Sequence, residues 1–429
     1  MKASKYNIVI PHKGNYIIYN TLWNKSIAVH HDNLATWGFD QNGVLKLSCV
    51  RKELLAVLKK HDIVLDDSVD EVEYMKSLWN KTIQDDGVFD IVIVPTLACN
   101  FSCWYCYEGH DNKKRMTDDD LYNIILMLKQ VVSTNSSIHT LQVDFFGGEP
   151  LLCFDSVVKP FLELINADDF LKTLKLSVGF TTNGYYLTSD VVTYLKRYNI
   201  SALQITLDGN EKRHNKVRFS KTCHATYHVI VNNILNCITQ NINVVLRLNI
   251  SDDTQLDVES LLADFDSMDN NSKQYLHVTI HKVWQASESV NDTIDAYVAQ
   301  VRSLGVDCSS YFSYPSSLWS CCYSDKKNNI IVTPQGLLYK CTARDFDENR
   351  VLGYIHDGGK VEFNSLYNRV DNLSPFDVKE CIECPIFPIC IGGCCQKRLE
   401  NRVGRNCPMY MDYNKMATYA KRVLIEKLK

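Results

Sequence analysis

The sequence lacks several features that would assign it to a class directly. No apolar run approaches the ~18–20 residues of a membrane-spanning helix, so we expect no membrane partner. The N-terminal residues lack the uninterrupted apolar core of an export signal, which predicts a cytoplasmic protein. Low-complexity tracts and short repeats are missing, and 45% hydrophobic with 22% charged residues is typical of folded chains rather than disordered ones.

An excess of charge of one sign is also lacking. The chain has 46 Lys and Arg against 50 Asp and Glu, a formal net charge of −4. Bulk electrostatics therefore gives no support to a nucleic-acid partner. With 429 residues, the chain is long enough for roughly two to four domains.

Cysteine, in contrast, is abundant, with 17 residues. In a secreted chain this number would suggest disulfides, but in a reducing cytosol grouped cysteines are more often metal ligands. Two dense groups occur, at 99–106 and 381–407. Metal or cluster binding is therefore the first hypothesis.

Changes in the pattern of expected strands and helices along the chain predict three domains, at 1–88, 89–306 and 307–429. The first resembles a small α+β unit, with expected strands at 6–11, 16–20 and 26–29 and helices at 53–60 and 69–79. In the third, regular alternation stops near residue 308. There we expect a hairpin of 329–333 with 337–340 and a terminal helix at 409–429, with bound metal supplying folding energy.

The second region alternates strands and helices. Strands are expected at 90–96, 141–146, 176–180, 203–207, 244–249 and 276–283, and helices at 118–132, 154–165, 189–198, 225–239, 256–268 and 293–303. The strands are mostly apolar and β-branched, as in sheets covered on both faces. Six β-then-α units predict an α/β fold with a parallel sheet, either open or closed into a partial (β/α)6 barrel.

The first cysteine group has the spacing C-x3-C-x2-C, with Cys99, Cys103 and Cys106 directly after the first strand of this series. That position is the carboxyl end of a parallel strand, where such folds bind ligands. Three thiolates suit a [4Fe–4S] cluster with one iron left open for a small molecule. The alternatives are a zinc knuckle or cysteines that merely pack in the core.

This segment resembles the signature of the radical S-adenosylmethionine (SAM) enzymes, which has an aromatic residue before the third cysteine, here Tyr105. The resemblance extends over about 90–305. It implies that the open iron chelates the amino and carboxylate groups of SAM. One electron would cleave SAM to methionine and a 5′-deoxyadenosyl radical, which abstracts a substrate hydrogen.

Further motifs at successive strand ends resemble the family's SAM-binding segments. Gly147-Gly148-Glu149-Pro150 is similar to the GGE motif, although alone it could be a simple turn. Arg218 ends an H-x3-R stretch, and its guanidinium fork suits a carboxylate. The SAM-binding residues implied by the resemblance are Tyr105, Gly147, Gly148, Glu149, Thr182, Asn183, Thr206, Asp208, Arg218 and Asn249.

The second cysteine group, with cysteines upstream of it, resembles the seven-cysteine pattern of the SPASM domain, including its glycine at Gly336. A structural zinc module is the alternative. The resemblance implies two auxiliary [4Fe–4S] clusters in addition to the SAM-binding one. The ligands would be Cys381, Cys384, Cys390 and Cys407 for one, and Cys322, Cys341 and Cys394 for the other. Cys321 could replace Cys322, and Cys308, Cys321 or a substrate thiolate could complete the second set.

SPASM-bearing radical SAM enzymes mostly modify peptides or proteins. Sulfatase-maturating enzymes carry an aspartate as general base after the second SPASM cysteine, where this chain has Thr342. Residues 6–79 resemble instead the N-terminal peptide-binding module of maturases that act on ribosomally made peptides. We therefore expect a leader-bearing precursor peptide as substrate, a side-chain crosslink such as a thioether as product, and flavodoxin or ferredoxin as reductant.

Two alternatives are formylglycine formation on a protein and a non-catalytic Fe–S electron carrier. No catalytic base is assigned, because Tyr339, Asp345 and Asp347 are candidates by proximity alone. The expected architecture is a partial (β/α)6 radical SAM barrel with an N-terminal α+β peptide-binding-like module and a C-terminal cysteine-rich SPASM domain.

Overall fold

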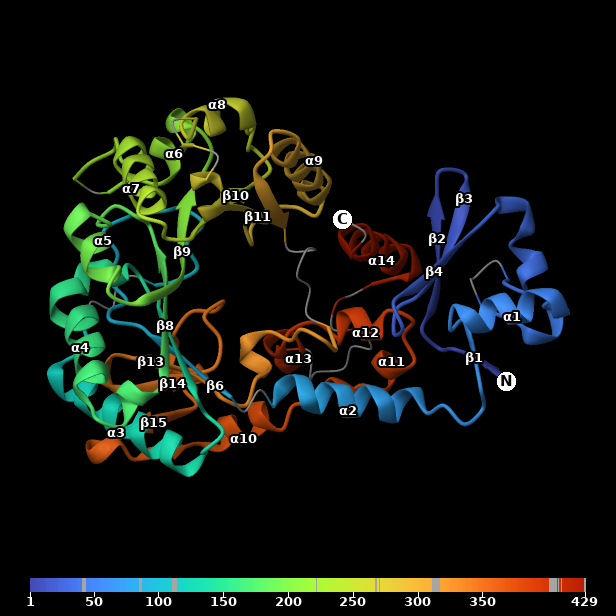
Figure 1. The fold of residues 1–429 in the computed structure, drawn as a ribbon, viewed down its shortest axis with the longest axis horizontal. Helices are drawn as coiled ribbons and strands as arrows, with labels where there is room; N and C mark the ends of the chain where they lie inside the picture. Colours follow the sequence, from blue (N-terminus) through green and yellow to red (C-terminus); the bar gives the residue numbers. More distant parts are fainter. Residues whose placement is uncertain are drawn as a thin grey trace. The chain divides into compact units, whose positions relative to one another are not determined.

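The structure is a computed structural model (Figure 1), and it describes residues 1–40, 44–84, 87–109, 114–220, 222–266, 268–269, 271–310, 317–400, 407, 409 and 411–427. The chain forms two compact units. The smaller comprises Met1–Asp85, Phe312–Lys327 and Arg369–Lys429, and the larger Asp86–Tyr311 and Asn328–Asn368. The three predicted domains are distributed over these units, and their boundaries stay predictions. No described helix is long and apolar enough to cross a membrane.

The larger unit is built on one eleven-stranded sheet, in the order β12-β11-β10-β9-β8-β7-β6-β13-β14-β15-β16. Strands β6 to β13 pair in parallel, and β13 to β16 pair antiparallel. The strands are β6 Val88–Ile93, β7 Thr140–Phe145, β8 Lys175–Thr182, β9 Asn199–Leu207, β10 Val244–Ile250, β11 Leu276–Lys282, β12 Asp307–Ser310, β13 Asn329–Thr333, β14 Leu337–Tyr339, β15 Gly353–Ile355 and β16 Val361–Phe363.

Helices α3 to α9 follow the outer side of the curved strand array (Figure 1). They are α3 Asp118–Thr134, α4 Lys159–Ala167, α5 Ser189–Leu195, α6 Glu211–Val217, α7 Tyr227–Thr239, α8 Val258–Ala263 and α9 Val290–Ser303; α10 spans Ser365–Asp371. Alternate strand residues, such as Leu246 and Leu248 of β10, enter the core shared with these helices. Arg247 and Asn249 therefore face the inner side of the sheet.

The predicted α/β fold with six parallel strands is confirmed, and two strands extend it. β12 adds a seventh strand beside β11. The predicted hairpin exists as β13 and β14, but β13 also pairs in parallel with β6, and all five residues of β13 are buried. The predicted helix at 154–165 begins instead with a π turn, Phe154–Val158, before α4, whose second residue is Pro160.

The smaller unit contains a three-stranded antiparallel sheet in the order β2-β3-β4 and a short pair of β1 with β5. The strands are β1 Lys2–Ala3, β2 Asn7–His12, β3 Asn15–Asn20, β4 Lys25–Val29 and β5 Val64–Leu65. The helices are α1 Lys52–Lys60, α2 Glu71–Ile83, α11 Lys379–Ile382, α12 Phe387–Cys390, α13 Cys395–Glu400 and α14 Tyr413–Lys427. The predicted terminal helix is thus α14, and residues 410, 428 and 429 lie outside the described ranges.

Both faces of the three-stranded sheet are buried. Ile8 and Ile10 of β2 pack with α12 and α14, while Val9 packs with the α1 side in a separate apolar cluster. The N-terminal strands and the C-terminal cysteine-rich segment therefore share one hydrophobic core within this unit. The alternation of apolar side chains along β2 fixes which face meets which partner.

Candidate metal and cofactor site

The first cysteine group lies in the loop that leaves the carboxyl end of β6. Thr96 ties the two ends of this loop together, because its hydroxyl donates to the carbonyl of Lys114 (2.9 Å) and accepts from the amide of Ala98 (3.1 Å). Burial raises the pKa of the Cys99 thiol to about 12, and it also raises the pKa values of the Cys103 and Cys106 thiols. A bound metal supplies the positive charge that such desolvated sulfurs need to ionise.

Chain donors aimed at sulfur identify the cysteines that suit a cluster. The amide of Phe101 donates to Cys99 Sγ and the amide of Ala343 to Cys341 Sγ, each at 3.4 Å. In the same way, the residue two positions further along the chain donates a hydrogen bond to the sulfur of Cys106, Cys322, Cys384 and Cys390. Hydrogen bonds to sulfur favour the thiolate, which is the form that ligates iron. These predicted ligands therefore fit Fe–S clusters.

The sequence left open whether two further cysteines, Cys321 and Cys308, are ligands. Their thiols act as hydrogen-bond donors. The thiol of Cys321 donates to the carbonyl of Thr82 (3.8 Å), and the thiol of Cys308 donates to the carbonyl of Ser309 (3.9 Å). Cys308 is also fully buried in the core of the larger unit. The sulfur of Cys322 instead accepts from the Ser324 hydroxyl (3.3 Å), so Cys322 fits the ligand role better than Cys321.

The Gly147-Gly148-Glu149 motif follows β7. Its backbone packs against the backbone of the loop that holds the first cysteine group, which we call the cluster loop. A Cβ on Gly148 would lie 2.3 Å from the carbonyl oxygen of Ala98, and one on Gly147 would lie 2.6 Å from that of Thr96. The φ of +116° at Gly147 further requires glycine. Both glycines thus allow close approach of this motif to the residues just before Cys99.

Glu149 is fully buried and joins two of the predicted segments. Its carboxylate accepts from the Thr182 hydroxyl (2.7 Å), the Asn183 amide (2.8 Å) and the Leu151 amide (3.0 Å). Burial raises the pKa of Glu149, and these hydrogen bonds oppose that rise. The carboxylate therefore holds the end of β8 beside the cluster loop, a role that the sequence alone did not indicate.

Tyr105 is the centre of a second network. Its hydroxyl donates to Asp208 Oδ2 (2.6 Å) and accepts from Arg218 Nη1 (2.7 Å) and Asn249 Nδ2 (3.1 Å). The cluster loop is thereby linked to the ends of β9 and β10 and to the residue after α6. Four predicted SAM-binding residues are brought together here.

This network retains unused polar atoms. Among the described residues, Asp208 Oδ1 and Arg218 Nε are buried with no hydrogen-bond partner. Burial raises the pKa of Asp208, while nearby Arg218 and the Tyr105 hydrogen bond oppose that rise. Buried polar groups normally find partners, so these atoms fit a polar ligand such as SAM. Thr206, the remaining predicted residue, lies on β9 beside Arg247 of β10.

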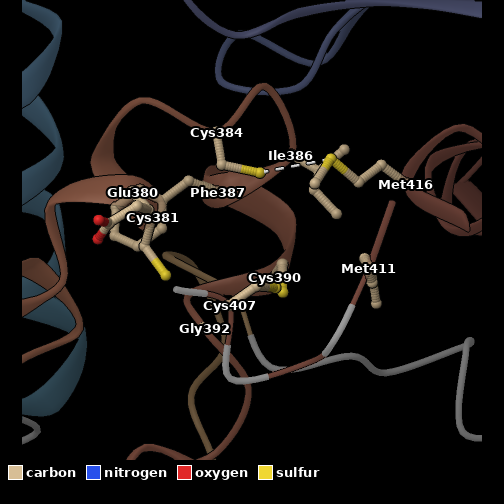
Figure 2. A pocket seen from close by; sticks show the side chains of 10 residues that line it. All are labelled: Glu380, Cys381, Cys384, Ile386, Phe387, Cys390, Gly392, Cys407, Met411 and Met416. Atoms are coloured by element: carbon tan, nitrogen blue, oxygen red, sulfur yellow. Dashed lines mark hydrogen bonds between the residues drawn. The ribbon is translucent and has the colours of Figure 1, made fainter. Parts of the chain in front are cut away.

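In the smaller unit, four predicted cluster ligands line one pocket of about 130 Å³. Figure 2 shows Cys381, Cys384, Cys390 and Cys407 around it, with Met411 and Met416 on one side. Cys384 Sγ lies 3.8 Å from Met416 Sδ. Burial raises the pKa values of Cys381 and Cys390 to about 12, and the neighbouring cysteines add to the rise. Four thiols in one apolar pocket fit a [4Fe–4S] cluster.

The predicted ligands of the second auxiliary cluster belong to different units. Cys322 and Cys394 belong to the smaller unit, where Cys394 adds to the raised pKa of Cys322, while Cys341 follows β14 in the larger unit. A buried ion pair of Arg398 with Asp325 stands near the first two, and Arg398 also donates to the carbonyl oxygens of Ile391 and Gly393. Sequence reasoning missed both residues of this ion pair.

A profile of the Radical SAM superfamily matches residues 93–264. The chain carries a radical SAM domain. This radical SAM enzyme is 22% identical over 390 residues to the radical SAM cyclopropyl synthase TigE of Paramaledivibacter caminithermalis (83% of this chain, 77% of TigE). It is also 22% identical over 340 residues to a cysteine-type anaerobic sulfatase-maturating enzyme of Clostridium novyi (71% of this chain, 86% of that enzyme).

Among solved structures, Streptococcus suis SuiB bound to precursor peptide SuiA matches with a TM-score of 0.52 and 14% identity, covering 96% of this chain and 98% of SuiB. The radical SAM fold expected from the motifs is thus confirmed. Radical SAM enzymes use SAM and a [4Fe–4S] cluster, and this chain is similar to a radical SAM cyclopropyl synthase and to an anaerobic sulfatase-maturating enzyme.

Proposed function

We propose that this radical SAM enzyme modifies a ribosomally made precursor peptide, with a side-chain crosslink such as a thioether as product. Cys99, Cys103 and Cys106 would hold the SAM-binding [4Fe–4S] cluster, which when bound supplies the electron that cleaves SAM. The Tyr105 network carries this assignment, because Tyr105 lies between Cys103 and Cys106 and bonds to Asp208 and Arg218, which hold the buried atoms without a described partner.

SAM itself would be held by the residues that the two networks join. Gly147, Gly148, Glu149, Thr182 and Asn183 would form one side, and Tyr105, Thr206, Asp208, Arg218 and Asn249 the other. Arg218 would pair with the SAM carboxylate, since its planar fork matches that group. The two auxiliary clusters would use Cys381, Cys384, Cys390 and Cys407, and Cys322, Cys341 and Cys394.

The peptide leader would pair with β4. In the β2-β3-β4 sheet, β2 and β4 are the edges. Tyr413 of α14 occupies β2, because its hydroxyl lies within hydrogen-bond distance of both the amide (3.2 Å) and the carbonyl (3.4 Å) of Val9. An extended peptide can add to an open sheet edge through main-chain hydrogen bonds, and β4 is the edge that remains.

Formylglycine formation is the weaker candidate. The residue after Cys341 is Thr342 rather than an aspartate, and the nearest carboxylate, Asp345, accepts a hydrogen bond from the amide of Gly109 (3.2 Å). A carboxylate in that position is fastened to the cluster loop, which does not favour its use as a general base.

The deciding experiment is anaerobic reconstitution with iron and sulfide, reduction by dithionite or flavodoxin, and assay of 5′-deoxyadenosine from SAM. We expect 5′-deoxyadenosine formation that is abolished in Cys103→Ala, while the auxiliary clusters remain. Peptides encoded beside the gene would then be tested by mass spectrometry, with hydrogen exchange reporting protection of Lys25–Val29. No SAM cleavage with such a peptide bound would contradict the proposal.

A further inference from the structure

Arg247 is a half-buried cation that the assignments above do not use. It lies on the inner face of β10, in register with Thr206 of β9 and Thr279 of β11. Its Nε donates to Asn249 Oδ1 (3.0 Å), and Asn249 in turn donates to the Tyr105 hydroxyl (3.1 Å). The guanidinium is therefore fixed in orientation next to the cluster-loop network.

Arg247 has no direct carboxylate partner among the described residues, and Asp208 acts on it only from a distance. No described carboxylate forms an ion pair with it within 4.0 Å, and burial lowers its pKa. Asp208 is engaged with Tyr105, and His281 of β11 is neutral because burial lowers its pKa to about 3. Partial withdrawal of a charge from water without a direct partner has a cost, so an arginine in this position is suited to bind an anion.

A neighbouring hydroxyl is also without a partner. Thr279 Oγ1 is buried and has no hydrogen bond to any described residue. Thr279 and Thr206 flank Arg247 on the two adjacent strands, so the inner face presents a guanidinium between two hydroxyl-bearing residues. A planar guanidinium with nearby hydroxyl donors matches the two oxygens of a carboxylate.

We propose that Arg247 and Thr279, with Thr206, bind a carboxylate on the inner face of the sheet. This inference rests on the proposed function, because it places the carboxylate beside the SAM site. Two molecules could supply the group: SAM itself, or an acidic residue of the peptide substrate. With Arg218 assigned to the SAM carboxylate, an acidic substrate residue would occupy Arg247.

The test compares Arg247→Gln and Thr279→Val with the exposed control Arg197→Gln in the reconstituted enzyme. Binding of SAM and of decarboxylated SAM is measured by anaerobic equilibrium dialysis. Binding of N-acetyl-aspartate and N-acetyl-glutamate N-methylamides, against their asparagine and glutamine counterparts, is measured by ligand-observed NMR with SAM present.

We expect Arg247→Gln to weaken a carboxylate probe about 10-fold to 100-fold, as for a lost charge-assisted hydrogen bond. If the variants lose binding of the acidic amides alone, the substrate supplies the carboxylate. If they lose binding of SAM but not of decarboxylated SAM, SAM supplies it. Thr279→Val keeps the shape of the side chain and removes an unpartnered hydroxyl. It should therefore fold, unfold at a higher temperature, and weaken the same probe by about 3-fold to 10-fold.

Unchanged binding of every carboxylate probe in both variants, relative to Arg197→Gln, would overturn the inference. A wild-type enzyme that binds no SAM would instead contradict the proposed function. If Arg247→Gln does not fold, Thr279→Val decides the question, since unchanged binding in that variant also overturns the carboxylate site.

Discussion

The hydroxyl of Tyr107 donates a 2.7 Å hydrogen bond to the backbone carbonyl of Thr342. Tyr107 follows Cys106 and Thr342 follows Cys341, so one hydrogen bond joins the neighbours of two expected cluster ligands. Asp345 strengthens the link through the Gly109 amide. The segment after Cys341 is therefore joined to the cluster loop by two hydrogen bonds within the larger unit.

Tyr107→Phe removes this hydrogen bond and keeps the ring. We expect a loss of about 0.5–1.5 kcal/mol in the free energy of unfolding and a changed EPR line shape of the SAM-bound first cluster. Differential scanning calorimetry and EPR measure the two effects. Tyr122→Phe, at a side chain that is 60% exposed on α3, is the matched control. Spectra identical to wild type would show that this hydrogen bond does not act on the cluster.

Tyr105→Phe removes the hydroxyl that joins Asp208, Arg218 and Asn249. These side chains lose their common partner, so we expect SAM affinity to fall by about 5-fold to 30-fold, with the iron content unchanged. Equilibrium dialysis of SAM and iron analysis test this. A variant with wild-type SAM affinity would mean that the network does not shape the SAM site.

Cys322→Ala and Cys321→Ala form a pair of adjacent substitutions with different expected outcomes. The sulfur of Cys322 accepts a hydrogen bond from the Ser324 hydroxyl (3.3 Å), whereas the thiol of Cys321 donates to the Thr82 carbonyl. Cys322→Ala should lower the iron and acid-labile sulfide content by disrupting one auxiliary cluster, and Cys321→Ala should retain it. Loss of iron in Cys321→Ala alone would reverse the ligand assignment.

Asp144, on the inner face of β7, gives a pH-dependent prediction. Burial raises its pKa to about 6, so the folded state retains a proton that the unfolded state releases between about pH 4 and 6. Ionised Asp144 therefore lowers stability above about pH 6 and has little effect near pH 4. Asp144→Asn should raise the free energy of unfolding by about 1–3 kcal/mol at pH 8, and only about half as much at pH 5. Urea unfolding at both values measures this, and equal effects would contradict the raised pKa.

The Asp325 and Arg398 side chains are only 3% and 2% exposed, respectively, in their ion pair. Asp325→Ala leaves a buried unpaired guanidinium, so we expect a loss of about 3–5 kcal/mol in the stability of the smaller unit. Asp66→Ala breaks the exposed pair with Lys59, where the side chains are 56% and 50% exposed, and should cost less than about 1 kcal/mol. Thermal unfolding of both variants tests the contrast, and a small effect in each would show that the buried pair is dispensable.

The sequence by itself determined the order and type of the six β-then-α units, because their strands are rich in apolar and β-branched residues and their helices carry one apolar stripe. It also determined the position of the cysteine motif after β6 and the motifs after β7 to β10, since carboxyl ends of parallel strands lie at one edge of a sheet. Tyr105, Asp208 and Arg218 were each expected among the SAM-binding residues, and the structure brings them within hydrogen-bond distance.

Only the tertiary structure decided which atoms within these motifs are already engaged. The carboxylate of Glu149 accepts three hydrogen bonds from its own chain, although the resemblance of its motif implies a SAM-binding residue. The pairing of β13 with β6 joins residues far apart in sequence, and no local pattern encodes that choice of partner. In the sequence, Arg247 is a polar residue in a mostly apolar strand. Only the register of β9, β10 and β11 places it between Thr206 and Thr279. Pairing, register and burial depend on contacts across the whole unit, so local sequence leaves them undetermined.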